Sequence, residues 1–98
     1  MFCGQINPNH FEWGKLYATS GIMEHIEKNP SLQQEVDLAL VLYSWKQWGN
    51  LCDEDKQMND DAIESGQDRI LARYNLSFGD IYIITEWNRS MTTIMLCD

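Results

Sequence analysis

The sequence predicts an α+β domain in which two to three helices pack on a C-terminal three-stranded antiparallel β-meander. Between residues 22 and 63, apolar residues recur every three or four positions, which is helical periodicity. From residue 69 onward they form short alternating or continuous runs separated by turns, which is typical of strands. The helices therefore precede the strands, the order expected of an α+β fold. We expect one domain over residues 1–98, with an irregular N-terminal segment over residues 1–14.

The first and third helices are predicted from their ends. After an extended stretch at residues 15–18, a helix begins near Thr19 and ends before Pro30, because a residue that precedes proline disfavours helical geometry. The third helix begins at residues 53–55, three acids that favour the positive end of a helix dipole, and ends at Gly66. Met58, Ala62 and Ile63 are expected to form its narrow buried stripe.

The second helix is predicted to be central and heavily buried. Ser31 and Gln34 form a capping box at its start, and the helix should run to about Trp48. Its apolar residues are spaced for one broad face that packs on the sheet. Leu42→Ala is therefore expected to cost about 2–5 kcal/mol. The predicted core consists of Leu38, Val41, Leu42, Trp45, Ile81, Ile83, Ile84, Ile94 and Leu96.

Three strands are predicted at residues 69–74, 81–85 and 91–97, joined by turns at residues 77–80 and 87–90. The middle strand is almost continuously apolar and rich in β-branched residues, so we expect it to lie in the centre of the sheet. The short third strand is expected to leave an open sheet edge.

Most of the charge lies in one window. Residues 53–68 carry seven acids and one base, a net charge of −6 in a chain whose total is −8. Such a face favours basic partners or cations, and it disfavours nucleic acid and anionic membranes. The alternative is a solvated face that only keeps the protein soluble. The acids are Asp53, Glu54, Asp55, Asp60, Asp61, Glu64 and Asp68.

The sequence does not predict a known catalytic or metal-binding motif. The acidic window aligns partly with a calcium loop that starts at Asp53, but Met58 stands where the loop needs glycine for its sharp turn. Cys3, Cys52 and Cys97 have no C-x-x-C spacing and no local catalytic signature. We therefore expect a protein that is not an enzyme and has no catalytic residue, cofactor or metal. Three dispersed cysteines and no signal peptide indicate the cytoplasm.

The turn at residues 86–90 carries a second polar cluster. Trp87 and Arg89 are residue types enriched in binding hot spots, so at an exposed loop tip they would form a contact point for a partner. The alternative is that the cluster fixes strand register, with Glu86 paired to Arg89 across the hairpin.

The chain also resembles a family of small acidic proteins common on bacterial plasmids, prophages and conjugative elements. The resemblance covers residues 14–98 and implies a mobile-element setting, with no activity and no catalytic residue. The family usually has Ala-Asp where this chain has Trp87-Asn88, and Leu-Pro where it has Leu96-Cys97. The matching residues are Trp48-Gly49, residues 53–56, Asn59-Asp60, Ala62, Gly66, residues 69–71, Tyr74, residues 83–86, Arg89-Ser90 and Thr92-Thr93, with a weaker match at Ala18-Thr19 and Gly21.

Two hypotheses of function follow. In the first, the protein binds and inhibits or modulates a host protein with a basic surface, such as a nuclease or restriction complex, because the acidic helix imitates DNA phosphates. In the second, it is an antitoxin-like accessory module that binds a partner or self-associates through apolar and aromatic surface. Neither involves direct nucleic-acid or membrane binding. The predicted partner-binding residues are Asp53, Glu54, Asp55, Asp60, Asp61, Glu64, Trp87 and Arg89.

Overall fold

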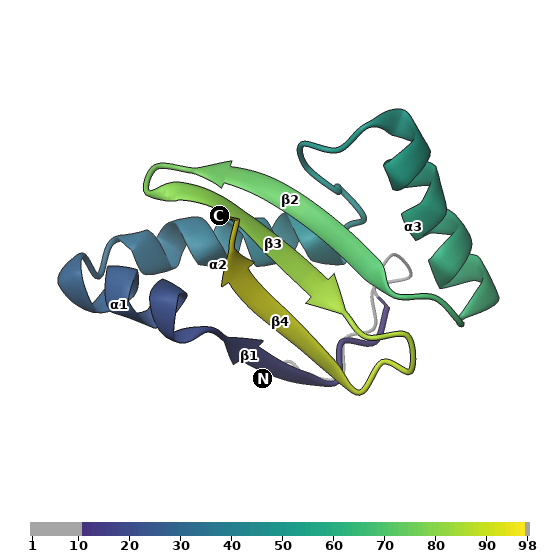
Figure 1. Ribbon diagram of the computed structural model, residues 1–98, viewed down its shortest axis with the longest axis horizontal. Coiled ribbons are helices and arrows are strands. Elements are labelled where there is room, and N and C mark those ends of the chain that lie inside the picture. The colour runs from purple at the N-terminus through teal and green to yellow at the C-terminus, as the bar shows by residue number, and fades with distance from the viewer. Residues whose placement is uncertain (1–10, 98) are drawn as a thin grey trace.

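The computed structural model describes residues 11–97, so most of the predicted irregular segment lies outside the described residues. Within this range, three helices and four strands follow one another along the chain (Figure 1). α1 and α3 lie close to their predicted positions, but α2 ends at Ser44, before the predicted end near Trp48, and the predicted capping box does not form, because the Ser31 hydroxyl donates to Asn29 instead. The elements are β1 (Lys15–Ala18), α1 (Ser20–Lys28), α2 (Leu32–Ser44), α3 (Asp53–Ser65), β2 (Ile70–Leu76), β3 (Gly79–Thr85) and β4 (Met91–Leu96).

The four strands form one mixed sheet in the order β1-β4-β3-β2. The predicted antiparallel meander is present as β2, β3 and β4, and β3 lies inside the sheet as expected. The extended stretch at residues 15–18 adds a fourth strand, because β1 pairs in parallel with β4. The expected open edge on the third strand is therefore wrong: Leu16 pairs with Thr92 and Ala18 with Ile94 along that edge.

The fold has two layers. Figure 1 shows the sheet from one face, with α2 running behind it and α3 beyond the edge strand β2. Alternate residues of β2 and β3 are buried against the helices, including Ile70, Ala72, Ile81 and Ile83. The residues between them are only partly buried, since no described helix covers the opposite face, which we call the open face. Ile84 lies on the open face, so its assignment to the core is wrong.

The orientation of α2 corrects the sequence prediction. Leu38 is 60% exposed and Val41 51% exposed, and Leu42 and Trp45 are also exposed. The buried face instead carries Leu32, Val36, Ala39 and Tyr43. Both stripes have helical spacing, so periodicity alone could not choose between them. The second stripe places Val36, Ala39 and Tyr43 in the core and gives the buried tyrosine a polar partner. Leu42→Ala should therefore cost less than a core substitution.

That polar partner is a chain of buried hydroxyl groups. The Tyr43 hydroxyl lies 2.7 Å from Thr85 Oγ1, which lies 2.7 Å from Thr92 Oγ1. Thr92 donates to the carbonyl oxygen of Trp13 at 2.8 Å, and each hydroxyl has one proton, so Thr85 donates to Thr92 and Tyr43 to Thr85. Burial raises the pKa of the Tyr43 phenol above its ordinary value of 10.0, which keeps this donor protonated. The chain joins α2, β3, β4 and the segment before β1.

The buried and the exposed face of α2 can be distinguished by making the same valine-to-alanine substitution on each. Val36→Ala should lower the free energy of unfolding by about 1.5–3 kcal/mol, because Val36 is buried and its truncation leaves a cavity. Val41→Ala on the exposed face should stay within about 0.5 kcal/mol of the parent. Urea unfolding measures both. Equal losses in the two variants would contradict the orientation of α2.

Candidate functional site

The acidic residues are displayed by α3, which lies beside the outer edge of β2 (Figure 1). The helix has three acids in its first turn and ends at Gly66, whose left-handed φ of 72° suits glycine at a C-cap. Among the described residues, the ion pair that forms is Arg73–Asp80, so no acid of α3 is neutralised in this way. We call the following exposed side chains the acidic face of α3: Asp53, Glu54, Asp55, Asp60, Asp61 and Glu64.

A side-chain amide attaches α3 to the sheet. Asn59 Nδ2 donates to the carbonyl oxygen of Leu71 at 2.7 Å, and its Oδ1 accepts from the Leu71 N–H at 3.1 Å. The amide thus bonds the outward-facing backbone groups of an edge strand, as a neighbouring strand would. Asn59 is buried although its helix is polar. This pair fixes the position of α3 along β2.

The next outward-facing residue of β2 is bonded by the loop that precedes α3. The Arg73 N–H donates to the carbonyl oxygen of Trp48 at 3.2 Å, and the Asn50 N–H donates to the carbonyl oxygen of Arg73 at 2.7 Å. Gly49 makes this approach possible, because a Cβ there would lie 2.0 Å from the Arg73 carbonyl oxygen. Its φ of 78° is also one that glycine adopts readily.

Two further contacts hold the helix. The indole Nε1 of Trp48 donates to Asp60 Oδ1 at 3.1 Å. At the other end, Arg89 Nη2 donates to the carbonyl oxygen of Ala62 at 2.9 Å, while its Nη1 donates to the carbonyl oxygen of Asp68 at 2.7 Å. A guanidinium group at the last turn of a helix also meets the negative end of the dipole. Arg89 therefore clamps the β3–β4 turn to the end of α3.

The predicted site residues are only partly brought together. The six acids of the acidic face are all exposed on α3, and the Arg89 contacts bring the 86–90 turn against the end of that helix. Trp87 is 61% exposed in this turn, and its role in partner binding stays a prediction. Arg89 is half-buried and also donates to the carbonyl oxygens of Glu86 and Trp87. The expected pairing of Arg89 with Glu86 thus uses the Glu86 backbone, and a role of Arg89 in partner binding stays a prediction.

Sequence reasoning missed a groove between α3 and the open face. This groove has a volume of about 480 Å³. Its apolar lining is Met58 and Leu71, and its charged lining includes Asp68 and Arg69. Met58 was expected to be buried in the helix stripe but is 66% exposed. The only local signal was one methionine among acids, and the contribution of Leu71 depends on how α3 meets β2.

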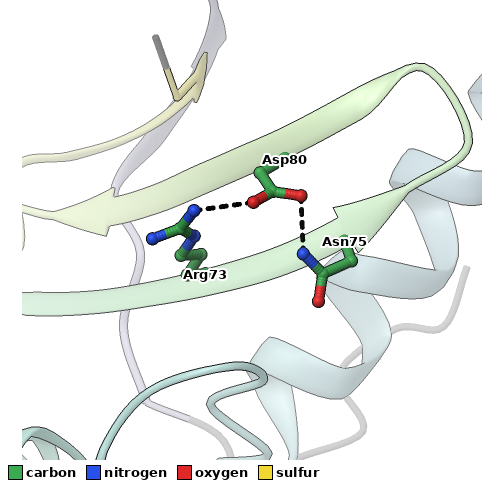
Figure 2. A network of polar contacts seen from close by, with 3 residues as sticks. All are labelled: Arg73, Asn75 and Asp80. Atoms are coloured by element: carbon green, nitrogen blue, oxygen red, sulfur yellow. Dashed lines mark hydrogen bonds and ion pairs between the residues drawn. The ribbon is translucent and has the colours of Figure 1, made fainter.

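The open face carries a polar network near the β2–β3 turn (Figure 2). Arg73 Nη2 donates to Asp80 Oδ2 at 2.7 Å, and Asn75 Nδ2 donates to Asp80 Oδ1 at 2.5 Å. These two hydrogen bonds, the Arg73 bond first, hold the pKa of the Asp80 carboxyl below its ordinary value. The Arg73 guanidinium also lies 5.8 Å from the centre of the Tyr82 ring. Both carboxylate oxygens of Asp80 at this end of the open face are thus paired within the protein.

The backbone of residues 53–65 differs from that of a calcium-binding loop. Residues 53–65 form a continuous helix, which spreads the aligned oxygen atoms along its axis, and Asn59 is bonded to Leu71. Within residues 11–97, no group of three or more His, Cys, Asp or Glu side chains could hold a metal ion. None of the helices in the same range has the length and apolar character needed to cross a membrane.

Comparisons with protein-family models, curated proteins and solved structures find no match for this chain. The function must therefore be argued from the surfaces themselves.

The Asn59 attachment can be tested by truncation. Asn59→Ala leaves the Leu71 N–H and carbonyl groups without their partner, so the free energy of unfolding should fall by about 1–3 kcal/mol. Amide exchange at Leu71 should also accelerate. Gln57→Ala, an exposed change on the same helix, should stay within about 0.5 kcal/mol. An Asn59→Ala variant as stable as the Gln57→Ala control would contradict the attachment.

The Asp80 network predicts a pH dependence. The folded-state pKa of Asp80 is depressed, so its contribution to stability is present above the unfolded-state pKa and is lost as pH falls through the lower folded value. The parent should therefore be more stable than Asp80→Asn at pH 7, and this advantage should shrink below pH 3.8, the ordinary value. Thermal melts across this range measure it. In an Arg73→Gln background the pH-dependent difference should diminish; an unchanged difference would rule out Arg73 as the main cause.

Proposed function

We propose that the protein works by binding another protein that carries a basic surface, and that the acidic face of α3 is the contact. Given the family resemblance, the proposed partner is a host protein whose activity is inhibited or modulated. Nucleic-acid-processing and defence proteins suit this role, because their grooves present lysine and arginine to phosphates. Carboxylates on α3 then occupy the positions of phosphate groups. The protein acts in this proposal by binding and not by catalysis.

The observation that carries the proposal is an acidic helix that is uncompensated and also fixed in place. The side chains of the acidic face are exposed, and no described residue forms an ion pair with them. Asn59, Trp48 and Arg89 hold the helix to β2 and to the 86–90 turn. A charged face that is already ordered loses little conformational freedom on binding, so more of its interaction energy contributes to affinity.

The physics of such a contact predicts its kinetic character. Charges on an exposed helix steer a basic partner during encounter and raise the association rate more than they slow dissociation. At physiological ionic strength the Debye length is about 8 Å, so added salt weakens this steering. The same negative field disfavours direct binding to nucleic acid or to an anionic membrane.

A second candidate function has support from α2. Its exposed apolar residues are spaced as i, i+3, i+4 and i+7, the pattern by which one helix packs on another. Such a surface suits the alternative of an antitoxin-like accessory module that binds a partner or self-associates. Apolar association of this kind depends weakly on salt, which separates it from the first proposal. This exposed stripe, which we call the α2 stripe, consists of Leu38, Val41 and Leu42 in the helix and Trp45 at its C-cap.

The charge-based proposal is tested by comparing partners recovered from a host lysate at low and at moderate salt. Two tagged variants change the formal charge equally, from −8 to −4. The α3 variant carries D53N, E54Q, D61N and E64Q. Asp60 is left unchanged because it accepts a hydrogen bond from the Trp48 indole. The control variant carries E12Q, E24Q, E27Q and D37N, all at exposed positions outside α3.

We expect the parent and the control variant to recover the same basic partner at low salt, and the folded α3 variant to lose it. The recovered partner is then purified, and its association rate should fall at least several-fold for the α3 variant only. Undiminished binding by a folded α3 variant would rule out the acidic face as the contact. In that case L38Q and W45Q in the α2 stripe become the informative changes.

A further inference from the structure

One surface combines charge with apolar area. The groove between α3 and the open face, which we call the α3 groove, has Met58 and Leu71 as its apolar lining. Its charged lining is three acids, Asp55, Asp61 and Asp68, and one base, Arg69, a formal charge of −2 from three negative groups and one positive. The groove therefore differs from the far side of α3, where Asp53 and Glu64 are exposed and do not line it.

The apolar lining continues onto the open face. In the strand register Leu71 lies beside Ile84, and Ile84 beside Thr93. In the next row the Tyr82 side chain lies beside Met95. These side chains are partly buried by one another, and no described helix covers them. The groove thus opens onto a half-apolar sheet surface with an acidic helix along one side.

We infer that the α3 groove binds a short segment of a partner protein in which an apolar side chain is flanked by lysine or arginine residues. This inference rests on the proposed function and names the side of α3 that the partner contacts. The apolar side chain packs against Met58 and Leu71, and the flanking cations approach Asp55 and Asp61. Exclusion of water around the apolar anchor strengthens the charge pairs beside it.

Charge complementarity selects this occupant over a second copy of the chain. The chain carries fifteen acids and seven bases, so two copies generally bring acid against acid, which costs free energy at an interface. The volume of about 480 Å³ also lies in the range of pockets that hold several side chains or a small ligand. A basic segment without an apolar residue would leave Met58 exposed to water.

The test uses three defined synthetic peptides and the whole protein. The first peptide is acetyl-Gly-Lys-Arg-Leu-Lys-Arg-Gly-amide. The second replaces its leucine with serine, and the third replaces its four basic residues with glutamine. Titration of ¹⁵N-labelled protein, followed by two-dimensional NMR, reports both the affinity and the residues contacted. We expect the first peptide to shift the amides of Met58, Arg69 and Leu71, and the other two to bind at least threefold more weakly.

Matched variants then separate the groove from general charge. D55N with D61N removes two acids that line the groove, and D53N with E64Q removes two exposed acids of the same helix that do not. The first pair should weaken the first peptide at least fivefold and the second pair less than twofold. For the apolar anchor, M58Q should weaken binding, whereas L38Q, an equally exposed position on α2, should leave it unchanged.

The outcomes distinguish this inference from the proposed function. If both pairs of acid substitutions weaken peptide binding equally, or if the leucine and serine peptides bind equally well, the inference that the groove is the binding site is wrong. A general role for the acidic face would remain. Absence of binding by all three peptides would also overturn the groove. NMR shifts confined to the α2 stripe would also contradict the inference, and would place the contact on that stripe instead. Loss of the lysate partner in the α3 variant tests the acidic face independently of any peptide.

Discussion

The outer edge of β2 is the constraint on which the rest of the structure depends. An edge strand presents unpaired N–H and carbonyl groups, which invite pairing with another chain. Here the backbone of Leu71 is bonded by the Asn59 amide, and the backbone of Arg73 by the loop around Gly49. Closing the edge in this way also fixes the start and the middle of α3. The same contacts therefore cover the edge of the sheet and hold the acidic helix in place.

Several residues on which the predicted family resemblance rests have structural roles in this fold. Gly49 permits the close approach to β2, and Asn59 and Asp60 bond the strand and the Trp48 indole. Thr85 and Thr92 belong to the buried hydroxyl chain, and Arg89 clamps the end of α3. A motif of polar residues is often interpreted as a catalytic site, but these polar groups are bonded to the backbone or to one another. They specify how α3 is attached to β2 and to the 86–90 turn.

Two surfaces of the molecule differ in the physics of the contacts they favour. In the two proposals, contact through the acidic face depends on electrostatic steering that salt weakens, whereas contact through the α2 stripe depends on removal of apolar area from water. The α3 groove combines both, because acids and apolar side chains line the same hollow. Charge alone gives fast but poorly selective encounters. An apolar anchor beside the charges adds the shape dependence that selectivity requires.

The sequence by itself determined the approximate positions of the elements, apart from the end of α2 at Ser44, because most helix ends and strands are marked by local chemistry. Pro30, Gly66 and the acids at residues 53–55 lie at the predicted boundaries, and the residues of β2, β3 and β4 pair in the predicted order. It also determined that residues 53–68, which include α3, carry a net charge of −6 out of −8. These features depend on residues close together in the chain, so they can be recognised without knowing how the helices and strands pack.

Only the tertiary structure decided which surfaces are exposed. α2 has apolar residues on two sides, and a tyrosine that reaches Thr85 selects the side that is buried. β1 pairs with β4 across more than seventy residues, a contact that no local pattern predicts. Met58 and Leu71 meet in the groove because Asn59 sets α3 against β2. The spacing of apolar residues shows which faces of a helix or strand could be buried. Contacts between residues far apart in the sequence determine which of those faces is buried.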